Sequence, residues 1–401
     1  MIYRVVGALL LAVTMAGCAR SPSALPALVA AASGLTIELT APVSTPPSAS
    51  VFVTGTFNRW NPGDPAFVLT RLGEGRYSIV LPDSIRGPIE FKFTLGSWET
   101  VELTSTGGGV SNRGFTVASP GPAMYSGVVE RWRDGARIAP LASTARSSVR
   151  VLDSAFAMPQ LGRSRRVWVY LPPDYATSTK TYPVLYMHDG QNVFDQATSF
   201  AGEWGVDETL DSLHAAGDPG VIVVAVDHGG ARRFDEYSPW RNAKHGGGDG
   251  DEYVDFLAET LKPHIDRTYR TRPDRRNTAV MGSSMGALIS LYAMLTHPEV
   301  FGRAGIFSPA FWVAPEAFAF ARDARPVRPD PRFYFVVGAR ETASVDEATA
   351  YVADQGRMID TLVASGFRRE SEIQAFVRSE GTHSEGFWRR EFPAAYLWLF
   401  R

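Results

Sequence analysis

The chain has 401 residues, of which 45% are hydrophobic and 20% charged, and this composition excludes a mostly disordered protein. Its 40 Lys and Arg residues nearly balance its 42 Asp and Glu residues, so it lacks the cationic surplus of a nucleic-acid-binding protein. The single Cys excludes an internal disulfide framework and a zinc site built from cysteines.

The chain begins with the pattern of a secretion signal. A basic start, Met1–Arg4, precedes the apolar run Val5–Val13, which is too short to span a bilayer as a stable helix. Cys18 follows Ala and Gly, and this arrangement resembles the bacterial lipoprotein signal. The resemblance implies that residues 1–17 are removed and that Cys18 carries a lipid anchor in the cell envelope. The residue after the Cys is not Asp, which in the family pattern favours the outer membrane, facing the periplasm. Residues 18–35 are rich in Ser, Pro and Ala and are expected to form a tether.

Residues 36–118 alternate short β-type runs with turns, a pattern typical of a small β-sandwich. The runs are LTIEL, SVFVTGTF, YSIVLP, IEFKFTLG and RGFTVA. Trp60 and Trp98 stand in turn sequences among Asn, Pro and Gly. Exposed aromatic rings of this kind bind sugars by stacking against the apolar C–H faces of the sugar rings.

The segments VFVTGTFNRWNP, IEFKFTLGSWETVE and NRGFTV resemble the starch-binding modules of carbohydrate-binding-module family 20 and their glycogen-binding relatives. This resemblance implies a polysaccharide partner and places Trp60, Lys92 and Trp98 on the main glucan site. The alternative is that both tryptophans pack against the neighbouring domain. Residues 119–148 are rich in Pro, Gly, Ser and Arg, and we expect them to form the linker between two domains.

Residues 149–401 show the pattern of an α/β domain. Apolar runs without alternation fit strands that are buried on both faces, and helical segments lie between them. The pattern predicts a mostly parallel sheet with helices on both sides. The predicted strands are RRVWVYLP, YPVLYMHDG, VIVVAVDHG, NTAVMGSS and RFYFVVGAR, and the predicted helices lie around 205–215, 251–267, 284–297 and 346–365, with a final helix RREFPAAYLWLF.

The sequence Gly282-Ser283-Ser284-Met285-Gly286 contains Gly-x-Ser-x-Gly between a predicted strand and a predicted helix. This is the context of a nucleophile elbow, in which a sharp turn lifts the serine above the sheet. The glycines are needed where side chains would clash. Ser284 then lies at a helix N-terminus, whose N–H groups and dipole stabilise a developing anion.

A serine nucleophile needs a base, which an acid must orient, and in this fold the chain order is Ser, acid, His. Only His297 and His383 follow the predicted nucleophile. His297 is expected to end the helix after the elbow, so His383, in a polar loop, is the predicted base. Glu341 is the first carboxylate after the strand RFYFVVGAR and is the predicted acid, with Asp346 as its rival.

Two segments compete for the oxyanion hole. His188-Asp189-Gly190-Gln191 follows the strand PVLYM, where one oxyanion N–H is expected. His245-Gly246-Gly247-Gly248 matches a motif known from lipases, but it comes after the next strand. It is therefore interpreted as a flexible loop at the rim of the site. The backbone N–H groups of Gln191 and Met285 are therefore the predicted oxyanion donors.

The motifs YPVLYMHDGQNVFD, EYSPW, DEYVDFLAETLKPHIDRTYR and GSSMGALISLYAMLTHPEVFG resemble the esterase-D-like family of α/β-hydrolases. That family includes enterochelin, feruloyl and acetylxylan esterases. The resemblance implies an α/β-hydrolase fold and places nucleophile, acid and base on Ser284, Glu341 and His383. Three aromatic residues are either pocket walls or core residues: Trp204, Tyr237 and Trp240.

The sequence shows no dinucleotide-binding, Walker-type or His-Glu-x-x-His motif, and neither a cofactor nor a metal is expected. We therefore expect a lipid-anchored serine ester hydrolase acting on carbohydrate-linked acetyl or feruloyl esters. The alternatives are a siderophore-ester hydrolase, an acyltransferase with the same residues, and a non-catalytic glycan-binding lipoprotein.

Overall fold

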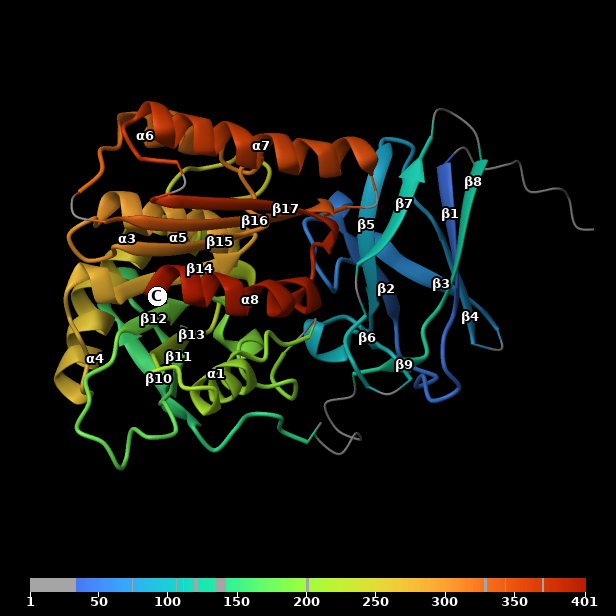
Figure 1. Ribbon diagram of the computed structural model, residues 1–401. Coiled ribbons are helices and arrows are strands. Elements are labelled where there is room, and N and C mark those ends of the chain that lie inside the picture. The colour runs from blue at the N-terminus through green and yellow to red at the C-terminus, as the bar shows by residue number, and fades with distance from the viewer. Residues whose placement is uncertain are drawn as a thin grey trace, which may run out of the picture.

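The computed structural model describes residues 34–401 except 74, 106, 111, 119–121, 134–141, 200–201, 328–329, 343 and 370. An all-β domain and an α/β domain lie side by side (Figure 1). The predicted signal peptide, Cys18 and nearly all of the tether lie outside the described residues. Within the described ranges, no helix has the length and apolar character needed to cross a membrane.

The N-terminal domain is built on a seven-stranded sheet in the order β7-β5-β2-β3-β4-β1-β8. β3 joins its two halves, and inward-facing side chains from both, such as Ile37, Val53 and Phe91, share one core. A short pair, β6 with β9, lies beside them. The strands are β1 Gly34–Thr40, β2 Val51–Gly55, β3 Val68–Gly73, β4 Arg76–Val80, β5 Gly87–Thr94, β6 Glu102–Leu103, β7 Arg113–Val117, β8 Pro122–Val128 and β9 Arg131–Trp132.

The predicted limits of this domain were wrong at both ends. β1 begins at Gly34, inside the predicted tether, and β8 and β9 lie inside the predicted linker 119–148. β8 pairs in parallel with β1, and its residues Ala123 and Tyr125 pack against the core. The composition of the segment suggested a linker, whereas pairing of Pro122 with Gly34, 88 residues earlier, makes it part of the sheet.

The α/β domain contains an eight-stranded sheet in the order β10-β11-β13-β12-β14-β15-β16-β17. The six strands from β13 to β17 in this order are parallel, and β10 and β11 form an antiparallel edge. The strands are β10 Val149–Met158, β11 Arg163–Tyr170, β12 Val184–Met187, β13 Ile222–Val226, β14 Thr278–Ser283, β15 Arg303–Phe307, β16 Arg332–Arg340 and β17 Ile373–Thr382. The structure confirms an α/β-hydrolase-like fold preceded by an all-β domain.

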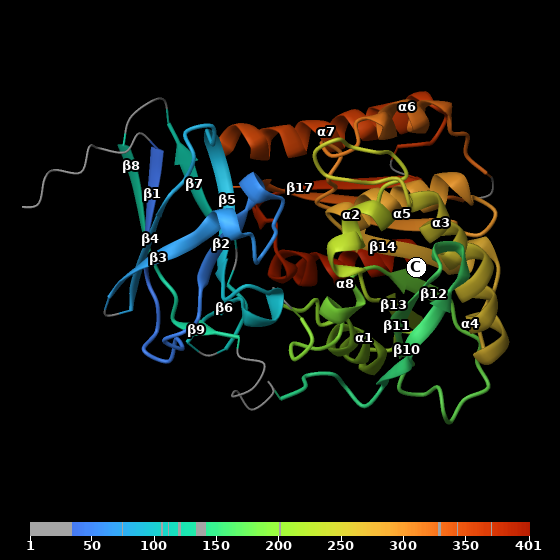
Figure 2. The ribbon, with the colours of Figure 1, turned by 180° about the vertical axis from the view of Figure 1, so that it is seen from behind.

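Helices cover both faces of this sheet (Figures 1 and 2). Successive side chains of a strand point to opposite faces, so Val184 joins one core and Leu185 the other. Helices α3 to α7 pack into the first core, and α1 and α8 into the second. They are α1 Val206–Ala215, α2 Arg233–Glu236, α3 Gly250–Asp255, α4 Lys262–Thr268, α5 Met285–Thr296, α6 Glu316–Asp323, α7 Val345–Ala364 and α8 Glu385–Phe400, with a π-helical turn, Phe256–Leu261, between α3 and α4.

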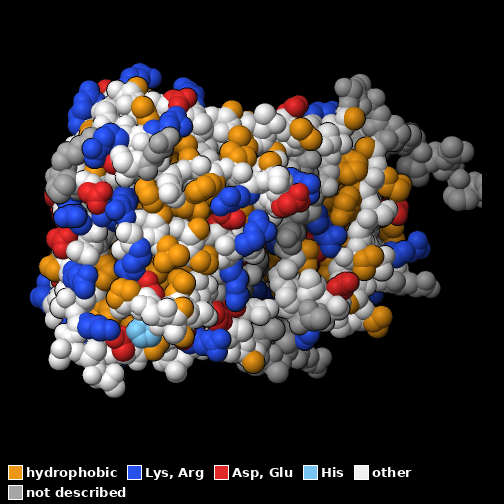
Figure 3. Space-filling view, viewed as in Figure 1, with side chains coloured by type: hydrophobic (Ala, Val, Ile, Leu, Met, Phe, Trp, Pro, Cys, Tyr) orange, Lys and Arg blue, Asp and Glu red, His pale blue; other side chains and the backbone are white. Residues whose placement is uncertain are grey.

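Hydrogen bonds hold the connecting segment against the α/β domain. Ser143 Oγ and Thr144 N donate to the carboxylate of Asp195, over 2.8 and 3.1 Å. Arg133, just after β9, donates to Ser199 O over 2.7 Å. On the face drawn in Figure 3, Lys and Arg side chains gather near the boundary between the domains. The all-β domain is therefore fixed to the loops that surround the carboxyl ends of the parallel strands.

Candidate active site

The turn between β14 and α5 has the geometry of a nucleophile elbow. Ser284 has a φ of 58° and a ψ of −119°, a strained conformation for a residue with a side chain. A Cβ on Gly282 would lie 2.8 Å from the carbonyl carbon of Gly286 and 2.9 Å from His188 Cδ2. Only glycine fits at position 282, as the motif predicted.

Neighbouring strands hold the backbone of this turn. Ser284 N donates to Phe307 O at the end of β15, over 2.9 Å. Ala310 N donates to Ser284 O over 3.2 Å. The segment that leaves β15 is thus fixed directly beside the predicted nucleophile.

Glu341 and His383 come together at the carboxyl ends of β16 and β17. His383 Nδ1 lies 2.7 Å from Glu341 Oε2, and the glutamate is only 2% exposed. Glu341 Oε1 accepts hydrogen bonds from Ser308 Oγ over 2.7 Å and from Gly338 N over 2.6 Å. The rival acid, Asp346, lies exposed in the first turn of α7. The structure therefore places Glu341, and not Asp346, on the histidine.

The environment of His383 favours its protonated form. Burial lowers the pKa of His383, but the hydrogen bond and charge of Glu341, together with the charges of Glu90 and Glu385, raise it, and the net shift is upward from the usual 6.5. Because Nδ1 faces the glutamate, Nε2 is the nitrogen available for proton exchange with a nucleophile. A carboxylate in this position stabilises the imidazolium that forms when a serine is deprotonated.

The predicted oxyanion segment lies against the elbow. Met285 is the first residue of α5, and the first N–H groups of a helix have no partner within it. Gln191 lies in a 3-10 turn, Gly190–Asn192, whose preceding strand bonds to β14 through His188 N and Met281 O at 3.2 Å. Thr198 Oγ1 donates to Gln191 O over 2.7 Å and steadies the turn.

A buried ion pair that the sequence analysis missed supports the same turn. Arg233 Nε and Nη2 donate to the two carboxylate oxygens of Asp189 over 2.7 and 2.8 Å. The neighbouring His188 lies 2.9 Å through Nδ1 from Tyr253 Oη, and burial lowers the pKa of His188 to about 4. His188 therefore stays neutral at pH 7. No sequence signal pairs Arg233 with Asp189, because the two lie 44 residues apart.

The loop that contains His245 is held more firmly than the predicted flexible rim. Gly247 N donates to Asp235 Oδ1 over 3.0 Å, and Gly248 N donates to Ser238 O over 2.7 Å. Two of its glycine N–H groups are thus already bonded, to Asp235 of α2 and to Ser238, which does not fit an oxyanion role.

Two of the three candidate pocket aromatics belong to the core. Trp204 is 4% exposed and Tyr237 is fully buried, while Trp240 is half-buried and packs edge-on against Tyr292. The half-exposed ring beside the site is instead Trp312, whose Nε1 donates to Tyr351 Oη. Neither residue carried a motif, so sequence reasoning missed both.

The structure gives the three residues of the predicted glucan site different environments. Trp60 and Trp98 lie together, with ring centroids 6.3 Å apart and both rings half-buried. Lys92 is only 4% exposed, and its ammonium donates to Val110 O. Burial lowers the pKa of Lys92. Lys92 thus does not present a charge on an open surface beside the tryptophans.

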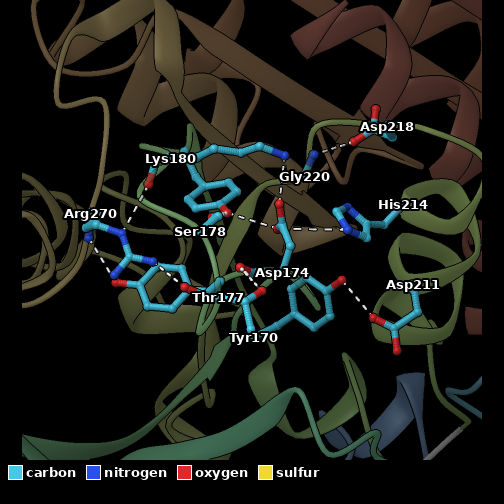
Figure 4. Close-up of polar contacts among 12 residues, drawn as sticks. Tyr170, Asp174, Thr177, Ser178, Lys180, Asp211, His214, Asp218, Gly220 and Arg270 are labelled. Atoms are coloured by element: carbon cyan, nitrogen blue, oxygen red, sulfur yellow. Dashed lines mark hydrogen bonds and ion pairs between the residues drawn. The ribbon is translucent and has the colours of Figure 1, made fainter.

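Figure 4 shows a second grouping of Ser, His and Asp side chains, around Asp174. Asp174, in the loop that precedes β12, accepts hydrogen bonds from Tyr182 Oη over 2.9 Å and from Lys180 Nζ over 2.7 Å. Ser178 Oγ bonds to Tyr182 Oη over 2.7 Å and not to a histidine. This network anchors a loop at the amino ends of the parallel strands. Among the described residues, no three His, Cys, Asp or Glu side chains are grouped to hold a metal ion.

Comparisons with known proteins identify the family of the α/β domain. The model of the Esterase family matches residues 158–399, and the chain therefore belongs to that family of hydrolases. It is 27% identical over 234 residues to an endo-1,4-beta-xylanase/feruloyl esterase of Xylanibacter ruminicola, across 57% of this chain and 28% of that protein. The enterobactin esterase FES of Shigella flexneri shares the fold, with a TM-score of 0.50, 17% identity and 88% of each chain covered.

The N-terminal region has relatives of another kind. It is 43% identical over 103 residues to an alpha-amylase of Niallia circulans, which covers 26% of this chain and 8% of the amylase. The match is consistent with a carbohydrate-binding module. The chain spans less than a third of the length of this amylase and of the xylanase/feruloyl esterase.

We expect Glu341→Gln to lower kcat by about 10²- to 10⁴-fold, because the imidazolium loses its counter-charge. The wild-type rate should rise with pH through an apparent pKa above 6.5, since the base must be neutral and Glu341 favours its charged form. In the variant, this midpoint should move to lower pH. The measurement is the kcat–pH profile on a short-chain ester. Asp346→Asn is the matched control, and an equal change in that variant would contradict the assignment of the acid.

Proposed function

We propose that the protein is a serine carboxylic ester hydrolase that works through an acyl-enzyme. The observation that supports this most directly is the Glu341–His383 contact of 2.7 Å, which Ser308 joins to the end of β15, where Phe307 O holds the strained elbow of Ser284. All three residues follow the carboxyl ends of parallel strands, where open α/β sheets place their ligands. Membership of the Esterase family supports the same reaction.

The proposed reaction has two halves. His383 Nε2 takes the proton of Ser284 Oγ as the oxygen attacks the ester carbonyl, and the N–H groups of Met285 and Gln191 hold the oxyanion. The C–O bond to the alcohol then breaks, and the alcohol leaves with the proton from His383. Water repeats the sequence on the acyl-enzyme and releases the acid. Glu341 stays ionised and stabilises the imidazolium in both halves.

We propose carbohydrate-linked esters, acetyl or feruloyl, as the substrates. The amylase-like N-terminal region and the feruloyl-esterase relative support this proposal. The all-β domain is held beside the active-site loops, so a bound polysaccharide would lie near the nucleophile. A siderophore ester is the second candidate, because the enterobactin esterase covers both domains, although a likeness at 17% identity extends to the fold alone.

Ser284→Ala should abolish hydrolysis, with a loss of about 10⁶-fold in kcat, because the nucleophilic oxygen is removed. The assay uses the fragment from residue 20 with methyl ferulate, feruloylated arabinoxylan, acetylated xylan and a catecholate trilactone. Turnover of the polysaccharide esters that disappears in the variant is the expected result.

Other outcomes point to the alternatives. Cleavage of the trilactone alone would favour the siderophore ester. Ester turnover only with a sugar acceptor would favour an acyltransferase. Folded wild-type protein that retains polysaccharide binding but turns over no ester would contradict the enzyme proposal and favour a glycan-binding protein.

The double variant Trp60→Ala/Trp98→Ala should bind polysaccharide at least about tenfold more weakly, because stacked rings supply most of the contact with a sugar face. Affinity electrophoresis of the same fragment in gels that contain starch or arabinoxylan measures this. Leu72→Ala removes another exposed apolar side chain of this domain and is the matched control. Equal retardation of wild type and double variant would show that these tryptophans do not bind glycan.

We also propose that Cys18 carries a lipid anchor, on the strength of the signal-like sequence before it. Expression of the full chain with an alkyne-bearing palmitate should label the wild type. Cys18→Ser should remain unlabelled, because the thiol that forms the thioether is absent. Equal labelling of both proteins would place any lipid elsewhere.

A further inference from the structure

Trp312 is a large apolar side chain that the fold leaves open to solvent beside the nucleophile. It is 47% exposed, and it lies two residues after Ala310, whose N–H donates to the carbonyl of Ser284. The adjacent residues Phe311 and Val313 are buried, so the segment is anchored on both sides of the ring. A tryptophan combines a large apolar ring with a polar N–H, and binding residues commonly stand on loops that a rigid scaffold positions, so an exposed tryptophan on this anchored segment is suited to contact a ligand.

The orientation of this indole is fixed by a second element. Trp312 Nε1 donates to Tyr351 Oη, on α7, over 2.7 Å. The Tyr351 ring in turn meets the His383 imidazole, with centroids 5.7 Å apart at an interplanar angle of 61°. A continuous row of rings therefore runs from the predicted base to the exposed indole.

The loop with His245 supports the other side of the indole. His245 meets Trp312 edge-on, with centroids 5.1 Å apart at 88°, and stacks on Phe234 at 6.1 Å. Asn242 Nδ2 donates to Val313 O over 2.7 Å and ties this loop to the tryptophan segment.

Three consecutive glycines shape this loop. Gly246, Gly247 and Gly248 have φ values of 93°, 107° and 112°, which only glycine adopts readily. A Cβ on Gly247 would lie 2.1 Å from Trp240 O. The three glycines, which match a motif known from lipases, thus allow the loop conformation that positions His245 against the indole.

His245 contributes to this surface as a neutral ring. Burial and the charges of Lys244 and Arg59 lower the pKa of His245. Arg59 belongs to the all-β domain, in the turn with Trp60, and both residues have left-handed φ values of 57° and 59°. The all-β domain therefore contributes one of the two positive charges that act on His245.

We propose that Trp312, Tyr351 and His245 form an aromatic platform that stacks the planar aryl group of the ester substrate. The proposal rests on the proposed esterase function and narrows it to aryl-bearing esters, since an acetyl group carries no ring to stack. Aromatic pairs of this geometry contribute to binding beyond their buried area. A hydroxycinnamoyl acyl group and a catechol group offer the same ring chemistry.

The test compares two methyl esters of similar size, methyl ferulate and methyl 3-cyclohexylpropanoate, and a small ester, methyl butyrate. Trp312→Leu should raise KM for methyl ferulate about threefold to tenfold, while kcat and the constants for methyl butyrate stay within about twofold. Trp312→Phe, which keeps a ring, should recover most of the loss. Leu397→Ala, an exposed position on α8, is the control.

Each alternative result has one meaning. An equal loss on all three esters, or a fall in kcat alone, would show a structural role and overturn the platform. No change on any ester would also overturn it. A loss on a catecholate trilactone but not on methyl ferulate would support the platform and assign its ligand to the catechol.

A binding measurement that needs no turnover tests the platform independently of the esterase proposal. Equilibrium dialysis of ferulate with Ser284→Ala and with Ser284→Ala/Trp312→Leu should show weaker binding to the second protein, whether or not the wild type hydrolyses any ester. Equal binding to both would overturn the platform even in an active esterase.

Discussion

The site depends on the hydrogen bonds that the buried carboxylate of Glu341 accepts. A carboxylate that is 2% exposed loses most of its hydration, which costs several kcal/mol unless donors replace the water. His383, Ser308 and Gly338 supply those donors, from segments at the ends of β17, β15 and β16. The same three hydrogen bonds that make the buried charge tolerable thus set the position of the imidazole. Trp388 Nε1, on α8, bonds to Ser308 Oγ over 2.9 Å and extends this network into the second core.

The parallel sheet determines where these groups meet. Its strands are parallel, so the segments after β12, β14, β15, β16 and β17 all leave the sheet at its carboxyl end. Helices on both faces bury the strands, so the site lies at the strand ends and not on a face of the sheet. The elbow, the turn with Gln191, the acid and the histidine are all placed by strand ends. The all-β domain and the segment that follows it contact the loops at the same end of the sheet, at Ser199 and Asp195.

Electrostatics separate the histidines around the site into different roles. Next to the ion pair of Asp189 and Arg233, burial dominates and holds His188 neutral. At His383, the hydrogen bond and charge of Glu341, with the charges of Glu90 and Glu385, outweigh burial and favour the charged form. Burial and two cations lower the pKa of His245, so that it offers a neutral ring to Trp312. One fold therefore holds a predicted base, His383, that can carry charge, and two further histidines that stay uncharged.

Much of this protein follows from local sequence. The elbow is predictable because a buried strand, two glycines and an apolar helix lie within about 20 residues, and β14, Ser284 and α5 have that order in the structure. The order of all-β and α/β domains, and the helices near 206–215, 285–296 and 345–364, follow from periodicity for the same reason.

The sequence by itself thus determined the features that depend on residues close together in the chain: the elbow, the helices and the order of the domains. The tertiary structure decided the rest. It selected Glu341 over Asp346, because the reach of a loop to a histidine depends on where β17 ends. It placed β8 in the sheet through pairing with β1. It buried Trp204 and Tyr237 while exposing Trp312, since burial depends on which distant elements pack against a ring.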